Sequence, residues 1–281
     1  MSRNGHPKDL QSALKNISMR ADRTIAHLQR ILATSSGTDS LLQTLQYTLL
    51  VLHTQLSRVR DWKLRLFVLA IARKASTNLL PGESVVATVQ SPTNNLDNVI
   101  AGSKAMSGMI SDFRIFTRLW GLLGIYDWAK STWDSPPEDR LIRSIVWTQV
   151  LAGAGFQWYE NLAYLAGKGV LRGERFNARK QSLWWEWSSR FWMVHVALEL
   201  VRLMRVWQLE AAEDDVDNAE KKGRKVEATN AWRRSTLSNV AWAPITAHYS
   251  WEQGMMSDQF VGLFGIVACG IKFRQVWKQT A

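Results

Sequence analysis

Apolar periodicity over residues 8–75 is the feature that most constrains how this chain folds. Apolar side chains recur every three or four residues across 8–33 and again across 41–75, which is the repeat of an amphipathic helix. Gly37 is a candidate stop for the first helix, and Asp39 or Ser40 is a candidate cap for the second. The seam of the second run consists of Leu45, Leu49, Leu52, Leu56, Val59, Trp62 and Leu66. These runs predict an all-α fold.

Positive charge is concentrated in the same part of the sequence. The chain has 35 Lys and Arg against 24 Asp and Glu, a net charge of +11. Residues 1–80 hold 12 Lys and Arg and 4 Asp, so they carry +8 of that excess. The second run carries Arg58, Arg60, Lys63 and Arg65, which do not collect on one clean face, although Lys63 lies near the apolar seam. A basic amphipathic helix favours the surface of an anionic phospholipid membrane, where each such charge contributes about 1 kcal/mol.

Two other interpretations of these helices exist. The first is an ordinary soluble helical scaffold, whose core would use the same apolar spacing. The second is nucleic-acid binding, because basic, aromatic-rich chains can neutralise phosphates and stack on bases. Here the basic residues lie on long amphipathic helices and the aromatic residues flank apolar runs, an arrangement that fits a membrane better than a nucleic acid. We therefore expect no nucleic-acid partner.

The rest of the chain alternates between helical and irregular composition. The expected divisions are a basic amphipathic region at 1–75, a loop at 76–107, central helices at 108–210, a charged linker at 211–230 and C-terminal helices at 231–281. Pro and Gly pairs predict the loop, and the run of acidic and basic residues predicts the linker.

Two nearly uncharged segments, 144–167 and 253–271, are the best candidates for embedding in a membrane. Each contains one acidic residue, Glu160 or Asp258, which should face protein, water or the interface because its exposure to lipid tails is costly. Small residues in these segments allow close helix contact and hence self-association. The predicted oligomer contacts are Gly153, Gly155, Gly262 and Gly265. The expected architecture is a membrane-associated all-α protein with N-terminal amphipathic helices and one or two C-terminal membrane-embedded helices.

The sequence offers no pattern of residues for catalysis or for binding a metal or cofactor. The single cysteine, Cys269, excludes a multi-cysteine metal site, and the five histidines lack metal-ligand spacing. We therefore expect no enzyme, no catalytic residues, no metal and no cofactor. An alternative function is a membrane pore for small metabolites, which would be favoured if Glu160 and His195 faced a shared interior.

Four stretches of the chain resemble the peroxisomal biogenesis factor 11 family in its fungal branch. They are residues 35–52, 113–131, 159–171 and 258–277, which occur in the order expected for the family. The residues that carry the resemblance are Gly37, Asp39, Gln46, Tyr47, Arg118, Leu119, Gly121, Gly124, Glu160, Asn161, Gly262 and Gly265. Ser40 departs from the pattern, because the family usually has a basic residue there.

The resemblance implies a peroxisomal membrane protein with both termini in the cytosol. It implies elongation of the membrane before division, by insertion of an amphipathic helix into one leaflet. It also implies a homo-oligomer and contact with proteins of the fission machinery. Solute pores have been proposed for some members, and the endoplasmic reticulum stays open as a second location.

Overall fold

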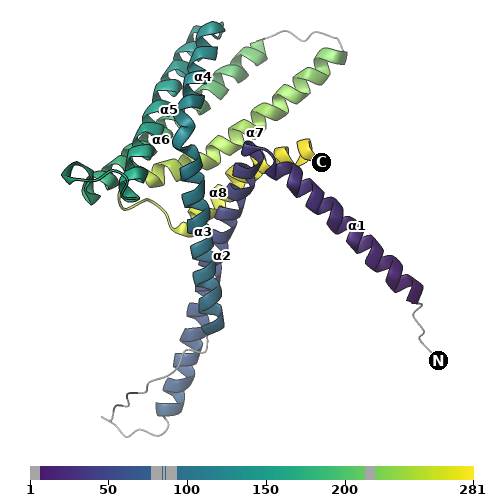
Figure 1. Ribbon diagram of the computed structural model, residues 1–281, viewed down its shortest axis with the longest axis vertical. Coiled ribbons are helices and arrows are strands. Elements are labelled where there is room, and N and C mark those ends of the chain that lie inside the picture. Colours follow the sequence, from purple (N-terminus) through teal and green to yellow (C-terminus); the bar gives the residue numbers. More distant parts are fainter. Residues whose placement is uncertain (1–6, 77–83, 85, 87–93, 213–218) are drawn as a thin grey trace.

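The computed structural model describes residues 7–76, 84, 86, 94–212 and 219–281 of the chain, and every regular element among them is a helix (Figure 1). The prediction of an all-α fold is therefore confirmed. The elements are α1 (Pro7–Leu32), α2 (Ser35–Ser76), α3 (Asn94–Thr117), η1 (Arg118–Trp120), α4 (Gly121–Asp134), α5 (Arg140–Gly167), η2 (Glu174–Phe176), α6 (Ala178–Ala212), α7 (Ala219–Tyr249) and α8 (Asp258–Thr280).

Two groups of helices make up the molecule. The long helices α2 and α3 pack side by side as an arm, and α4, α5 and α6 form a second group beyond η1 (Figure 1). Helices α7 and α8 connect the groups, because α7 packs on α6 and α8 packs on both α7 and α2. Helix α1 projects away from the rest. Its C-terminal end is held by α8, where Arg30 donates a hydrogen bond to the carbonyl of Thr280.

The buried core lies where α2, α7 and α8 meet. Its centre is formed by Tyr47, Ile245, Val261 and Cys269. The Tyr47 ring lies edge-on to Trp242, with their centroids 5.8 Å apart. This core fixes the N-terminal half of α2 against the C-terminal helix, and it leaves the other half of α2 to extend beyond α8.

The predicted loop at 76–107 is wrong over its second part. Residues 94–107 are helical, because α3 begins at Asn94. Buried Ile100 and Ser103 give this segment a face that packs on α2, so its glycines do not end the helix. Ser84 and Val86 are irregular, as expected, and the rest of 77–93 lies outside the described residues.

The predicted linker at 211–230 is likewise helical where it is described. Helix α6 continues to Ala212, α7 begins at Ala219, and residues 213–218 lie outside the described residues. Residues 223–230 are almost all exposed, so the charged composition reports a solvated helix rather than an irregular linker. The central region also has an unexpected break, since η1 separates α3 from α4.

The predicted stop of the first helix and the predicted caps of the second are wrong as well. Helix α2 begins at Ser35, so Gly37, Asp39 and Ser40 all lie inside it. Gly37 packs against the carbonyl of Ile31, where the chain turns between the two helices. The sharp turn between α1 and α2 is therefore possible because a glycine can lie close to the Ile31 carbonyl. Asp39 does not cap a helix and is available for another contact.

Among the described residues, α8 is the one helix long and apolar enough to cross a membrane, judged by length and composition. Of its most apolar window, 28% is buried inside the protein, which leaves most of that surface able to face lipid. The helix begins only at Asp258, so the start of the predicted segment 253–271 precedes it. Helix α5, which contains the predicted segment 144–167, does not meet the same measure. One of the two expected anchors is therefore supported.

Candidate functional site

An exposed apolar stripe runs along α2, on the seam that the sequence predicts. Five of its members are between 42% and 60% exposed, and the other two, Leu49 and Leu56, are partly buried at its edge. The five exposed members are Leu45, Leu52, Val59, Trp62 and Leu66. They stay exposed because the packing partners of α2 use other faces. The Gln46 carbonyl accepts a hydrogen bond from Ser107 of α3, and Val51 packs on α8.

A second apolar stripe runs along α3, and its first part was missed in the sequence, because residues 76–107 were expected to be a loop and helix was expected only from 108. Its members are also exposed and are Val99, Met106, Met109, Phe113 and Phe116. Val99, Met106 and Phe113 are each seven residues apart, which is nearly two helical turns and was a usable signal. The side of α3 that packs on α2, which includes Ile100 and Ile110, is buried.

The two stripes lie on the same side of the α2–α3 pair. The helices are antiparallel, because Asp39 pairs with Arg114 near one end and Arg60 lies beside Asp97 near the other. Successive residues of a helix are about 100° apart around its axis, so the centre of each stripe lies roughly 110° around its own helix from the side that faces the partner helix. The rotations have opposite senses in antiparallel helices, so both stripes point the same way. We call their ten exposed side chains the arm face.

Basic residues surround the arm face, but they are not equivalent. Arg58, Lys63 and Arg65 are exposed, whereas Arg60 donates a hydrogen bond to Asp61 at 2.9 Å and lies 3.6 Å from a carboxylate oxygen of Asp97. Lys63 lies within the stripe, where its alkyl chain can cover apolar surface while the ammonium group reaches the water. Arg58, Lys63 and Arg65 are therefore better placed to attract anionic groups than Arg60.

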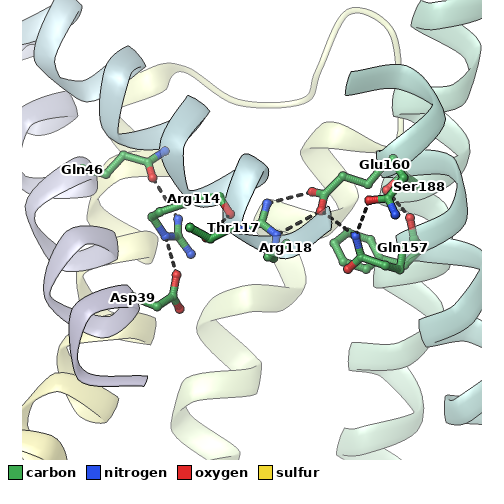
Figure 2. A network of polar contacts seen from close by, with 10 residues as sticks. Asp39, Gln46, Arg114, Thr117, Arg118, Gln157, Glu160 and Ser188 are labelled. Carbon is green, nitrogen blue, oxygen red and sulfur yellow. Dashed lines mark hydrogen bonds and ion pairs between the residues drawn. The ribbon is translucent and has the colours of Figure 1, made fainter. Parts of the chain in front are cut away.

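A network of charged and polar side chains holds the arm to the rest of the protein (Figure 2). At one end, the buried Arg114 donates from Nε to Asp39 at 2.8 Å and from Nη1 to Gln46 at 2.9 Å. At the other end, Arg118 donates from Nη2 and Nε to the two carboxylate oxygens of Glu160, at 2.7 and 3.0 Å. The first set joins α3 to α2, and the second joins η1 to α5.

The network gives a structural role to several residues that carry the family resemblance. Asn161 donates from its amide to the Leu119 carbonyl at 3.0 Å, and Gln157 donates to Asn161 at 2.7 Å. Glu160, expected to avoid lipid, is indeed turned into the protein. Arg114 was not identified from the sequence, because its partner Asp39 is 75 positions away.

Glu160 and His195 do not share an interior. The Glu160 carboxylate is held by Arg118, whereas His195 lies beside Trp128, with their ring centroids 6.0 Å apart, and lines a separate cavity. The observation that would favour a pore is therefore not met in the arrangement of these two side chains.

The four predicted oligomer glycines pack against helices of the same chain. A Cβ atom at Gly155 would lie 2.8 Å from the Phe191 ring of α6, and one at Gly262 would lie 2.6 Å from Cγ2 of Val51 on α2. Gly265 packs against Tyr47, and Gly153 makes an ordinary contact with Ile125 of α4. The close helix contacts exist, but here they are internal. Self-association stays a prediction and needs another surface.

A family model described as peroxisomal biogenesis factor 11 (PEX11) matches residues 85–277, well over half of the chain. The chain belongs to this family. Membership supports a role in peroxisome biogenesis or proliferation and implies association with the peroxisomal membrane. The family is one of biogenesis factors rather than known enzymes. The matched residues include α3 and the helices after it, whereas α1 and α2 lie before the match.

A curated relative agrees with the fungal assignment. An uncharacterized protein of Schizosaccharomyces pombe is 26% identical over 198 residues, which cover 69% of this chain and 87% of that protein. No solved structure matches the chain.

Proposed function

We propose that this PEX11 protein elongates the peroxisomal membrane to promote the proliferation and division of peroxisomes. The single observation that carries the proposal is the arm face, an apolar surface shared by α2 and α3 that no described element covers. Apolar side chains that gather on one exposed side of a helix pair mark a site of interaction with a membrane or another protein. The neighbouring basic residues Arg58, Lys63 and Arg65 favour an anionic phospholipid membrane as the partner.

The mechanism is a wedge in one leaflet. An amphipathic helix that lies in the interface buries its apolar side chains about 5–10 Å into the boundary between headgroups and acyl chains. The added volume expands the outer part of the bilayer and favours positive curvature. A pair of helices with apolar stripes on the same side inserts a wider wedge than one helix, and the polar network holds that pair at a fixed angle to the remaining helices.

Helix α8 is the proposed anchor. It is the described helix whose composition suits a membrane span, and it packs directly on α2. The protein would then sit in the peroxisomal membrane. A single crossing by α8 would place the two termini on opposite sides, so the expected cytosolic location of both requires α8 to embed in the membrane without crossing it. Self-association and recruitment of the fission machinery, both expected from the family, would follow at the elongated membrane. The endoplasmic reticulum is a second location to examine.

The proposal is tested by charging the arm face in cells. In Leu52→Asp with Val59→Asp, two acidic groups replace side chains that are 42% and 43% exposed. The matched control places the same charges at Leu237 and Val240 of α7, which are 53% and 51% exposed and lie off the arm. Fluorescence microscopy of overexpressed fusions measures location and peroxisome shape.

We expect the arm variant to reach peroxisomes but to leave them unelongated, and the α7 variant to elongate them as the wild type does. An arm variant that elongates peroxisomes normally, at equal abundance, would show that the arm face is not the remodelling element.

A further inference from the structure

A cavity of about 470 Å³ lies among α4, α5, α6 and α7, in the helix group that the proposed membrane contact does not use. Trp128 comes from α4, Gln149 from α5, His195 and Arg202 from α6, and Asn239 from α7. Its volume is within the range of small-molecule sites, which are usually concave, partly apolar and lined by a few convergent polar groups. Four helices thus bring polar side chains from distant parts of the chain to one cavity.

The one carboxylate in the wall of this cavity is already neutralised. Glu199 accepts hydrogen bonds from Arg202 Nε at 2.7 Å and Nη2 at 2.6 Å, and from Gln149 Nε2 at 3.0 Å. Burial acts to raise the pKa of Glu199, but the hydrogen bonds from Arg202 and Gln149 and the positive charge of Arg202 outweigh burial and lower it. Glu199 is therefore ionised at neutral pH, and its charge is balanced by Arg202 rather than directed at a ligand.

Hydrogen-bonding capacity remains in the wall on both the donor and the acceptor side. Arg202 uses Nε–H and one N–H of Nη2 on Glu199, so the two N–H groups of Nη1 and the second N–H of Nη2 remain as donors. His195 Nδ1 is buried with no hydrogen-bond partner among the described residues. Gln149 uses its amide nitrogen on Glu199 and on the His195 carbonyl, and Asn239 uses its amide nitrogen on the Ser235 carbonyl. The amide oxygens of Gln149 and Asn239 are then the acceptors on offer.

We propose that this cavity binds the phosphate group of a small organic phosphomonoester. Phosphate oxygens accept hydrogen bonds from an arginine and a histidine, and arginine is the preferred side chain for such oxygens. A phosphomonoester has a second pKa near 6, so its singly protonated form also donates one hydrogen bond, which an amide oxygen can accept. A carboxylate of the same size has no such donor. Trp128 and the neighbouring Val146 provide the surface for the carbon part of the ligand.

The same group occurs in soluble metabolites and in lipid headgroups, and two probes separate these sources. Glycerol 3-phosphate represents the soluble source, and dihexanoylphosphatidic acid, used below its micellar concentration, represents the lipid source. Calorimetric titration of the purified full-length protein in detergent measures the binding of each. Glycerate is the comparison ligand, because it has a carboxylate in place of the phosphate group.

Three variants give the titration its specificity. Val146→Phe fills the cavity without changing its charges, and Arg202→Gln removes the cationic donor. Arg190→Gln is the matched control, because Arg190 pairs with Glu186 on the same helix and lies outside the cavity lining. Loss of a hydrogen bond to a charged group corresponds to a factor of about ten or more in affinity. We expect both cavity variants to weaken binding by at least that factor and the control to leave it unchanged.

Binding of either phosphate probe with this pattern supports the proposal, and the stronger probe identifies the source. The proposal is overturned if neither probe binds the wild type, if Val146→Phe binds like the wild type, or if glycerate binds as tightly as glycerol 3-phosphate. Circular dichroism of each variant confirms that it is folded. Should Arg202→Gln fail to fold, Val146→Phe decides the question, since it leaves the Glu199 pair intact.

Discussion

The ion pair between Arg118 and Glu160 gives an asymmetry that can be measured. Glu160 is 5% exposed and Arg118 is 33% exposed, so the two partners differ in how well water can replace the missing group. In Arg118→Met, the Glu160 carboxylate stays buried and loses both hydrogen bonds from Arg118, while the 3.5 Å hydrogen bond from Gln157 remains. Breaking a buried pair in this way costs about 3–5 kcal/mol, mostly because an uncompensated charge remains.

The reverse change is milder. In Glu160→Gln, Arg118 keeps one acceptor of nearly the same shape and has access to water through its exposed third. The expected cost is about 1.5–3 kcal/mol, the usual value for a hydrogen bond to a charged group. Arg60→Met is the matched control, because its pair with Asp61 is exposed and exposed ion pairs contribute little to stability.

Thermal unfolding of the detergent-purified protein, followed by far-ultraviolet circular dichroism, measures the difference. At about 2–4 °C per kcal/mol, Arg118→Met should lower Tm by roughly 6–20 °C, Glu160→Gln by less, and Arg60→Met least of all. The reasoning is refuted if Arg118→Met unfolds with the control, or if Glu160→Gln is the more destabilised of the two variants.

Three further predictions concern the Glu199 carboxylate, the packing of Gly265 and the membrane binding of α2. The pKa of Glu199 is lowered in the folded protein, so its ionised form stabilises the fold above the ordinary carboxyl pKa of 4.5. That stabilisation is lost as the pH falls through the lower pKa of the folded state. Glu199→Gln should therefore make Tm depend less on pH in the acid range. Gly265→Leu should cost about 1–3 kcal/mol by overpacking against Tyr47, whereas Gly124→Leu meets open space and should unfold like the wild type in the same thermal assay. A peptide of residues 41–75 should gain helicity on anionic vesicles and less on neutral ones, as measured by circular dichroism; no change on anionic vesicles at low salt would remove α2 as a membrane-binding helix.

The long helices could be predicted from the sequence because a three-or-four repeat is a local property. The first part of helix α3 was harder, since Gly102 and the Asn94-Asn95 pair are signals of loops. Gly102 faces open space and is tolerated because buried residues on another side of α3 pack on α2. Packing against a helix that is distant in the sequence therefore outweighed the local preference for a loop, and no local sequence pattern indicates that packing.

The contact partners of individual residues could not be predicted from the sequence for the same reason. The glycines at 262 and 265 indicated close helix contact, but their composition could not tell a second copy from α2 of the same chain. Asp39 looked like a cap, whereas the fold uses it as the partner of Arg114. The seam on α2 is exposed at five of its seven positions, and its contact with a membrane stays a prediction. Its continuation on α3 depends on the antiparallel pairing that only the structure provides.

Tubulation of anionic liposomes by the purified full-length protein tests the central claim most directly, with electron microscopy used to count tubules. A charge buried at the centre of a membrane helix costs about 2.5–3.5 kcal/mol, and two such charges match the attraction from several basic residues. Leu52→Asp with Val59→Asp should therefore abolish tubulation while α8 still holds the protein on the liposomes, and Leu237→Asp with Val240→Asp should tubulate like the wild type. Equal tubulation by the arm variant and the wild type, at equal bound protein, would contradict the account.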